Sequence, residues 1–139
     1  MPEGGCFCGN VRIAYEGEPR GKAICHCLDC RKIGGSTYST NIIVPGSGFK
    51  IVSGTPKTIS KAADSGKQIT SHFCGDCGST LFRDGPSFGD NKVIKVGIMD
   101  DVNALEDAKP AVELFAGRKA SWVLDVPGAK KVNAGQLQG

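Results

Sequence analysis

Cysteine is the residue whose type and spacing most clearly predict chemistry in this chain. Short spacings between cysteines let one turn of backbone direct two thiolates at a single ion, and zinc takes four such ligands in a tetrahedron. Seven is an odd number, so disulfides cannot pair every thiol, and we expect metal binding. The seven cysteines form three groups, which are the pair Cys6 and Cys8, the trio Cys25, Cys27 and Cys30, and the pair Cys74 and Cys77.

Seven ligands divide naturally into a closed set of four and an open set of three. The thiols of the trio are close together in the sequence, so we expect them to form one site and the two outer pairs to close the other. A closed four-sulfur zinc site is structural, whereas three protein ligands leave a position for water or substrate. The outer site would join the start of the chain to its middle, which strongly restricts the unfolded chain.

Two histidines offer alternatives for the trio. His72 lies two residues before Cys74 and is the candidate fourth ligand that would make the trio a second structural site. The alternative for His72 is an ordinary strand histidine. His26 lies between two proposed ligands, so its side chain should point away from their ion and support them or pack. A redox-active C-x-x-C is a third interpretation, but the βαβ context of a thioredoxin-like site is not apparent.

Glycine and proline recur along the chain with short β-branched runs between them, which predicts a mostly β fold with little helix. A helix is expected over 28–33, stopped by Gly34 and Gly35, with a second possible over 101–108. We expect Trp122 to lie in the core, with the lining of a pocket as the alternative. The runs with strand character are 11–15, 37–44, 49–52, 68–73, 93–99, 113–116 and 121–124.

Length and charge exclude several classes of protein. A chain of 139 residues suits a single domain, which we place over 1–139 with its core at about 4–126. The formal net charge of +3 is too weak to indicate a nucleic-acid partner or a polybasic membrane anchor. The sequence contains neither a secretory signal nor an apolar run long enough to span a membrane. We therefore expect a cytoplasmic protein whose thiols stay reduced.

Three motifs in order carry a resemblance to a known family. GGCFCGNVR, CHCLDCRKIGGS and FCGDCGSTLF resemble the glutathione-dependent formaldehyde-activating enzyme family, which shares its domain with centromere protein V. The resemblance covers about 4–126 and implies an Mss4-like (β-tent) zinc-binding domain. It implies a carbon–sulfur lyase that converts S-(hydroxymethyl)glutathione to glutathione and formaldehyde, and the reverse. The implied sites are a structural zinc on Cys6, Cys8, Cys74 and Cys77, and a second, catalytic zinc with an open position on Cys25, Cys27 and Cys30.

The implied mechanism places a thiol on the second zinc. Coordination deprotonates a thiol, and the thiolate could then attack an aldehyde carbon or be released by the reverse step. Arg31 and Lys32 follow the trio and could hold a carboxylate of glutathione, or form a solvated basic turn. The alternatives to this enzyme are a non-catalytic zinc-stabilised interaction module, and an enzyme of the same fold that acts on a different small metabolite.

Overall fold

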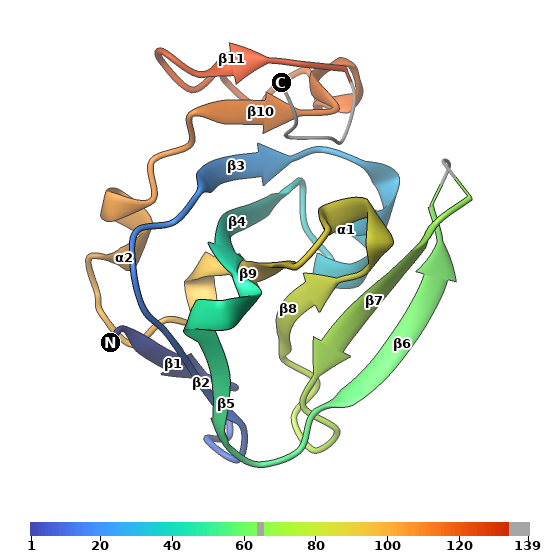
Figure 1. The fold of residues 1–139 in the computed structure, drawn as a ribbon. Coiled ribbons are helices and arrows are strands. Elements are labelled where there is room, and N and C mark those ends of the chain that lie inside the picture. The colour runs from blue at the N-terminus through green and yellow to red at the C-terminus, as the bar shows by residue number, and fades with distance from the viewer. Residues whose placement is uncertain (64–65, 134–139) are drawn as a thin grey trace.

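The computed structural model describes residues 1–63 and 66–133, which form mainly β-strands, as the sequence predicts (Figure 1). Two short α-helices, α1 (Leu28–Gly34) and α2 (Ala104–Asp107), connect strands. None of the helices in the described part of the chain is long and apolar enough to cross a membrane. The strands are β1 (Glu3–Gly5), β2 (Arg12–Tyr15), β3 (Gly21–Cys25), β4 (Ser39–Pro45), β5 (Phe49–Ser53), β6 (Lys57–Ala62), β7 (Gln68–Phe73), β8 (Thr80–Asp84), β9 (Asn91–Lys95), β10 (Val112–Leu114) and β11 (Lys130–Lys131).

Within these residues the strands form a small and a large sheet. The small sheet has the order β1-β2-β5, and the large one has the order β11-β10-β3-β4-β9-β8-β7-β6. Neighbouring strands are antiparallel except around β10, which pairs in parallel with both β3 and β11. The large sheet curves around the small one, with β10 and β11 at one end and β6 and β7 at the other (Figure 1).

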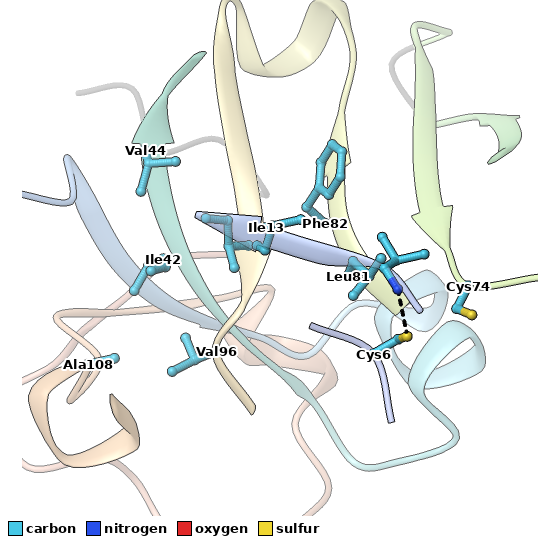
Figure 2. Packing of buried hydrophobic residues seen from close by; sticks show 11 residues of the cluster. Cys6, Ile13, Ile42, Val44, Cys74, Leu81, Phe82, Val96 and Ala108 are labelled. Atoms are coloured by element: carbon cyan, nitrogen blue, oxygen red, sulfur yellow. Dashed lines mark hydrogen bonds between the residues drawn. The ribbon is translucent and has the colours of Figure 1, made fainter. Parts of the chain in front are cut away.

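The main core lies between the small sheet and one face of the large sheet. Ile13 of β2 is fully buried against residues of β4, β8 and β9 (Figure 2). The register aligns Ile42, Ile94 and Phe82 across the three central strands, so their side chains share one face. Cys6 and Cys74 belong to the same buried cluster, which anchors the outer cysteine pairs to the core.

The opposite face of the large sheet carries polar side chains and faces α1. Successive residues of a strand point to opposite faces. Arg83 and Lys95 directly follow Phe82 and Ile94, and therefore point away from the main core. Asn41 lies opposite Lys95 in the register, and Ser71 lies opposite Arg83. The fold thus collects two basic and two neutral polar side chains beneath the first helix.

Several predicted elements match the structure. The runs at 11–15, 37–44, 49–52 and 68–73 correspond to β2, β4, β5 and β7, and the expected helices correspond to α1 and α2. The run at 93–99 is shorter as a strand, because β9 ends at Lys95 and Val96–Ile98 forms a 3₁₀ turn. Likewise β10 ends at Leu114, since Phe115 adopts a left-handed backbone conformation with φ of 51°.

The C-terminal expectations around Trp122 were wrong. The run at 121–124 forms no strand, and the side chain of Trp122 is 73% exposed rather than in the core. Leu114, Phe115 and Val132 supply the apolar contacts of this part of the chain instead. The sequence pattern missed β6, an exposed edge strand whose residues lack an apolar face, and it also missed the central strands β3 and β8.

Replacing Ile94 by Ala should lower the free energy of unfolding by about 2–5 kcal/mol, because the truncation leaves a cavity in a fully buried position. Ile59→Ala is the matched control, since this isoleucine is 55% exposed on the edge strand β6 and should cost less than about 0.5 kcal/mol. Urea unfolding of both variants with excess zinc measures the difference. Equal losses in the two variants would contradict the placement of the core.

Candidate metal centres and the adjoining pocket

The outer cysteine pairs meet in space as a group of four, Cys6, Cys8, Cys74 and Cys77, here called the outer group. Their sulfur atoms all lie within 4.8 Å of one another. The Sγ atoms of Cys6 and Cys8 are 3.6 Å apart, and those of Cys8 and Cys74 are 3.7 Å apart. These distances are far too long for disulfides, and all seven cysteines are free. A tetrahedron with Zn–S bonds of 2.3 Å has edges of about 3.8 Å, so the donor set fits zinc.

Two tight turns present the sulfurs of the outer group. Gly9 and Gly78 have φ of 84° and 81°, a conformation that side chains other than glycine rarely adopt. Their amides donate to the carbonyls of Cys6 and Cys74, closing each turn at 3.0 and 2.8 Å. The amide of Val11 donates to Cys6 Sγ at 3.2 Å. Backbone donors of this kind stabilise negative charge on sulfur.

Ser79 joins the two turns of the outer group. Its Oγ accepts a hydrogen bond from the amide of Phe7 at 3.0 Å and lies 3.3 Å from Cys77 Sγ. Hydrogen bonding to the Ser79 side chain and backbone lowers the pKa of Cys77 to about 5. The outer group therefore favours a thiolate at Cys77, which is the form that binds metal. At Cys8 a backbone hydrogen bond from Asn10 lowers the pKa, but burial and the neighbouring cysteine sulfurs outweigh it and raise the pKa to about 12.

The three remaining cysteines form a second group, here called the trio. Cys25 ends β3, Cys27 is the N-cap of α1, and Cys30 lies in the first turn of that helix. The amide of Cys30 donates to Cys27 Sγ at 3.2 Å, so the start of the helix itself positions the thiol of Cys27. The helix ends where Gly35 adopts a left-handed conformation with φ of 60°.

Charge within the trio is unevenly shared. Hydrogen bonds from the thiols of Cys25 and Cys27 lower the pKa of Cys30 well below its ordinary value, and the positive charge of Lys95 acts in the same direction. The same contacts raise the pKa of Cys25. The trio thus favours a thiolate at Cys30. Its three sulfur donors fit a soft divalent ion such as zinc with one coordination position left over.

Two basic residues that the sequence analysis missed lie against the trio. Arg83 is only 8% exposed, and its Nη1 is 3.8 Å from Cys30 Sγ while its Nε donates to Ser71 Oγ at 3.1 Å. Lys95 donates from Nζ to Asn41 Oδ1 at 2.8 Å. A signal was present in the sequence, because each cation directly follows two apolar residues, LF before Arg83 and VI before Lys95.

A pocket of about 350 Å³ opens beside the trio. Cys30 and Lys95 line it together with the hydroxyl-bearing residues Tyr38, Thr40 and Ser79. A larger hollow of about 600 Å³ lies elsewhere, but no cysteine lines it and its wall carries acidic residues that would repel an anionic substrate. The smaller pocket is therefore the one that adjoins reactive sulfur.

Arg31 and Lys32 lie on α1, exposed and outside the lining of this pocket. They follow Cys30 directly and precede Ile33 and Gly34, which do line it. The structure thus brings these two residues near the pocket rim without placing them inside. Their contact with a glutathione carboxylate stays a prediction.

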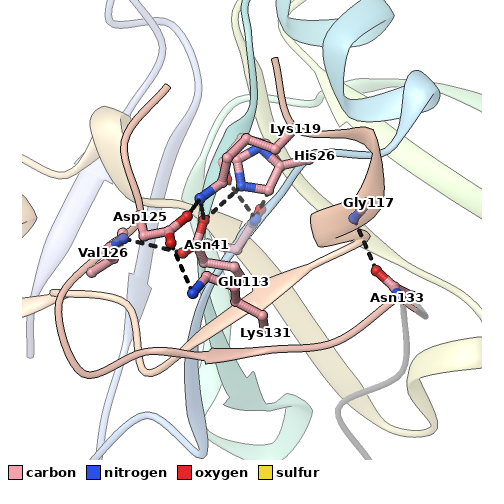
Figure 3. A network of polar contacts seen from close by, with 10 residues as sticks. His26, Asn41, Glu113, Gly117, Lys119, Asp125, Val126, Lys131 and Asn133 are labelled. Carbon is pink, nitrogen blue, oxygen red and sulfur yellow. Dashed lines mark hydrogen bonds and ion pairs between the residues drawn. The ribbon is translucent and has the colours of Figure 1, made fainter. Parts of the chain in front are cut away.

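The two histidines lie apart from the sulfur donors. The Nε2 atom of His72 is 2.8 Å from Asp84 Oδ1, and its ring stacks on Phe82 with centroids 4.1 Å apart. The side chain of His72 points to the face of the sheet that packs on the main core, whereas Arg83 points to the other face. His72 belongs to neither cysteine group. His26 is fully buried, and its Nε2 lies 3.0 Å from Glu113 Oε1 (Figure 3). As expected, the His26 side chain points to a supporting residue and not to the sulfurs.

Glu113 is the centre of a buried polar network behind the trio (Figure 3). Its carboxylate accepts hydrogen bonds from the Lys119 side chain at 2.7 Å and from the Val126 amide at 3.1 Å. Burial alone would raise the pKa of Glu113, but the hydrogen bonds from Lys119, Val126 and His26 lower it. The network therefore joins the C-terminal segment to the backbone between Cys25 and Cys27.

Comparisons with known proteins agree with this fold. The family model of the glutathione-dependent formaldehyde-activating enzyme matches residues 1–118. A crystal structure of a Rhodobacter sphaeroides protein is similar, with a TM-score of 0.62 and 21% sequence identity over 78% of this chain and 96% of that chain. At this identity the likeness shows a shared fold. Comparison with curated proteins gave no match.

Replacing His72 by Gln should leave the zinc content at saturation unchanged, because the imidazole is held by Asp84 and not by the cysteine groups. Loss of the hydrogen bond should lower stability by roughly 1 kcal/mol. Elemental analysis of wild-type and variant protein measures the zinc, and thermal unfolding measures the stability. If the variant bound one zinc fewer, His72 would be a metal ligand after all.

Proposed function

The chain belongs to the glutathione-dependent formaldehyde-activating enzyme family, and from this premise we propose that it is a carbon–sulfur lyase acting at the pocket beside the trio. The substrate would be a thiol–aldehyde adduct such as S-(hydroxymethyl)glutathione. One observation carries the proposal. Of the two cysteine groups, the outer one offers a full set of four donors, whereas the trio offers three and has Cys30 in the wall of a pocket.

We propose two zinc ions per chain with different tasks. Cys6, Cys8, Cys74 and Cys77 would hold a structural ion, and Cys25, Cys27 and Cys30 would hold the catalytic one. Bound at the trio, zinc would supply a position that keeps a substrate sulfur deprotonated at neutral pH. The outer ion would contribute folding free energy by joining the turn after β1 to the turn after β7.

The residues of the pocket suit the cleavage of such an adduct. When the C–S bond breaks, its electron pair stays on sulfur, and the proton of the hydroxymethyl oxygen passes to solvent water as formaldehyde forms. Lys95 places a positive charge near the sulfur, and the hydroxyls of Tyr38 and Thr40 line the pocket, where they could form hydrogen bonds with the hydroxymethyl oxygen. In this proposal Arg31 and Lys32 hold a glutathione carboxylate at the rim.

The same proposal covers organisation and location. We propose one domain over residues 1–139, in the cytoplasm, where reducing conditions keep the seven thiols free. The partners would be small thiols and aldehydes rather than nucleic acid. A different aldehyde or thiol as the true substrate would use the same sulfur site.

Replacing Cys27 by Ser should abolish formaldehyde release from S-(hydroxymethyl)glutathione, because it removes one of only three donors at the trio. About one zinc per chain should be lost, while the circular dichroism spectrum stays that of the wild type. Formaldehyde detection and metal analysis on one preparation give both results. An unchanged rate would contradict the lyase proposal, and a wild type that binds zinc but releases no formaldehyde would favour a non-catalytic module.

Replacing Cys74 by Ser should instead destabilise the whole domain. This cysteine is 1% exposed and belongs both to the outer group and to the main core. Losing a structural zinc removes several kcal/mol of folding free energy, so we expect a largely unfolded chain at 37 °C. Heteronuclear NMR of the two cysteine variants compares them directly. A folded Cys74→Ser protein that retains all its zinc would show that the outer group is no structural site.

A further inference from the structure

Arg83 and Lys95 differ from the other basic residues of the interior in lacking an acidic partner. Lys92 pairs with Asp84, and Lys119 pairs with Glu113 and Asp125. In the part of the chain that the structure describes, no carboxylate lies within ion-pair distance of Arg83 or Lys95. Their polar contacts are neutral groups, Ser71 for the arginine and Asn41 for the lysine, together with Cys30 Sγ.

Burying the cation of Arg83 without a counter-charge is costly, and the half-buried Lys95 is also partly removed from water, so we look to the trio for the negative charge. Arg83 is 3.8 Å from Cys30 Sγ, and Lys95 lines the pocket that Cys30 also lines. The sheet positions both side chains, because each donates a hydrogen bond to a residue of a neighbouring strand on the face opposite to the main core. The two positive charges are therefore fixed parts of the sulfur site.

The balance of charge then depends on the fourth ligand of the proposed zinc. Three thiolates and one Zn²⁺ sum to −3 + 2 = −1. Adding Arg83 and Lys95 brings the site to −1 + 2 = +1. A neutral water in the fourth position leaves this charge, whereas a thiolate brings it to zero. Zinc also prefers soft sulfur among the available anions.

We propose that Arg83 and Lys95 are specificity-determining residues that bias the open position of the trio towards an anionic sulfur ligand. This inference rests on the proposed zinc site. The two residues divide the task. Arg83 is buried behind Cys30 and fixes its sulfur, whereas Lys95 is only half-buried and lines the pocket that the incoming thiol enters.

The test uses Lys95→Met, which removes the charge but keeps an unbranched side chain of similar length. The probe is 2-mercaptoethanol, which has no carboxylate, so weaker binding cannot come from a lost carboxylate contact. It is titrated into protein that is loaded with cobalt in place of zinc. The cysteine thiolates already give a sulfur-to-cobalt charge-transfer band, and the increase of this band on titration reports the binding of a fourth thiolate at the trio. We expect the Kd of the thiol to rise about tenfold. Lys95→Arg should stay within about threefold of the wild type.

Lys92→Met is the matched control. It removes a lysine from the same strand, but from the opposite face, where Asp84 is its partner. Thiol affinity should stay at the wild-type value. An unchanged Kd in Lys95→Met, or an equal loss in Lys92→Met, would overturn the inference.

The two proposals fail in different ways. If wild-type protein binds 2-mercaptoethanol in a manner that depends on Lys95 but releases no formaldehyde, the lyase proposal fails and the charge inference stands. If formaldehyde release is present and Lys95→Met binds the thiol normally, only the charge inference fails. If the charge-transfer band of the wild-type cobalt protein does not increase when the thiol is added, the trio binds no added sulfur, and the inference is overturned.

Discussion

Repulsion between clustered thiolates is the constraint on which the rest of this structure depends. Each cysteine group holds its sulfurs within 4.8 Å, where negative charges repel strongly unless something positive lies close. The two groups meet this need differently. Backbone amides and Ser79 surround the outer group, whereas the trio has the side chains of Arg83 and Lys95. One group is thereby suited to stay closed, and the other faces a pocket.

The large sheet keeps these two environments separate. Its register sends Phe82 and Ile94 into the main core and sends Arg83 and Lys95 to the other face, so one pair of strands serves both purposes. A slip of one residue would exchange the faces and bury both cations in the apolar core. The packing of the core and the electrostatics of the pocket are consequently set by the same hydrogen-bonded ladder.

The C-terminal segment holds the trio from behind. Strand β10 pairs in parallel with β3. Its residue Glu113 forms a hydrogen bond with the side chain of His26, which lies between two cysteines of the trio in the sequence (Figure 3). The same carboxylate binds Lys119 and the amide of Val126, which draws the chain after β10 onto this end of the sheet. Fixing His26 in this way orients the segment that carries Cys25 and Cys27, even though no cysteine follows Cys77 in the sequence.

The sequence by itself determined which cysteines come together and much of the local structure. Cysteine spacing predicted one group of four cysteines and one group of three. Helix α1 and several strands were also recognisable, because turns, helix caps and the alternation of apolar residues are encoded by residues close together in the chain. Only the tertiary structure decided what surrounds the sulfurs. Arg83 reaches Cys30 across 53 residues, and Lys95 reaches Asn41 across 54. The exposed position of Trp122 likewise follows from packing. Such contacts depend on strand order and register, which short-range patterns do not encode.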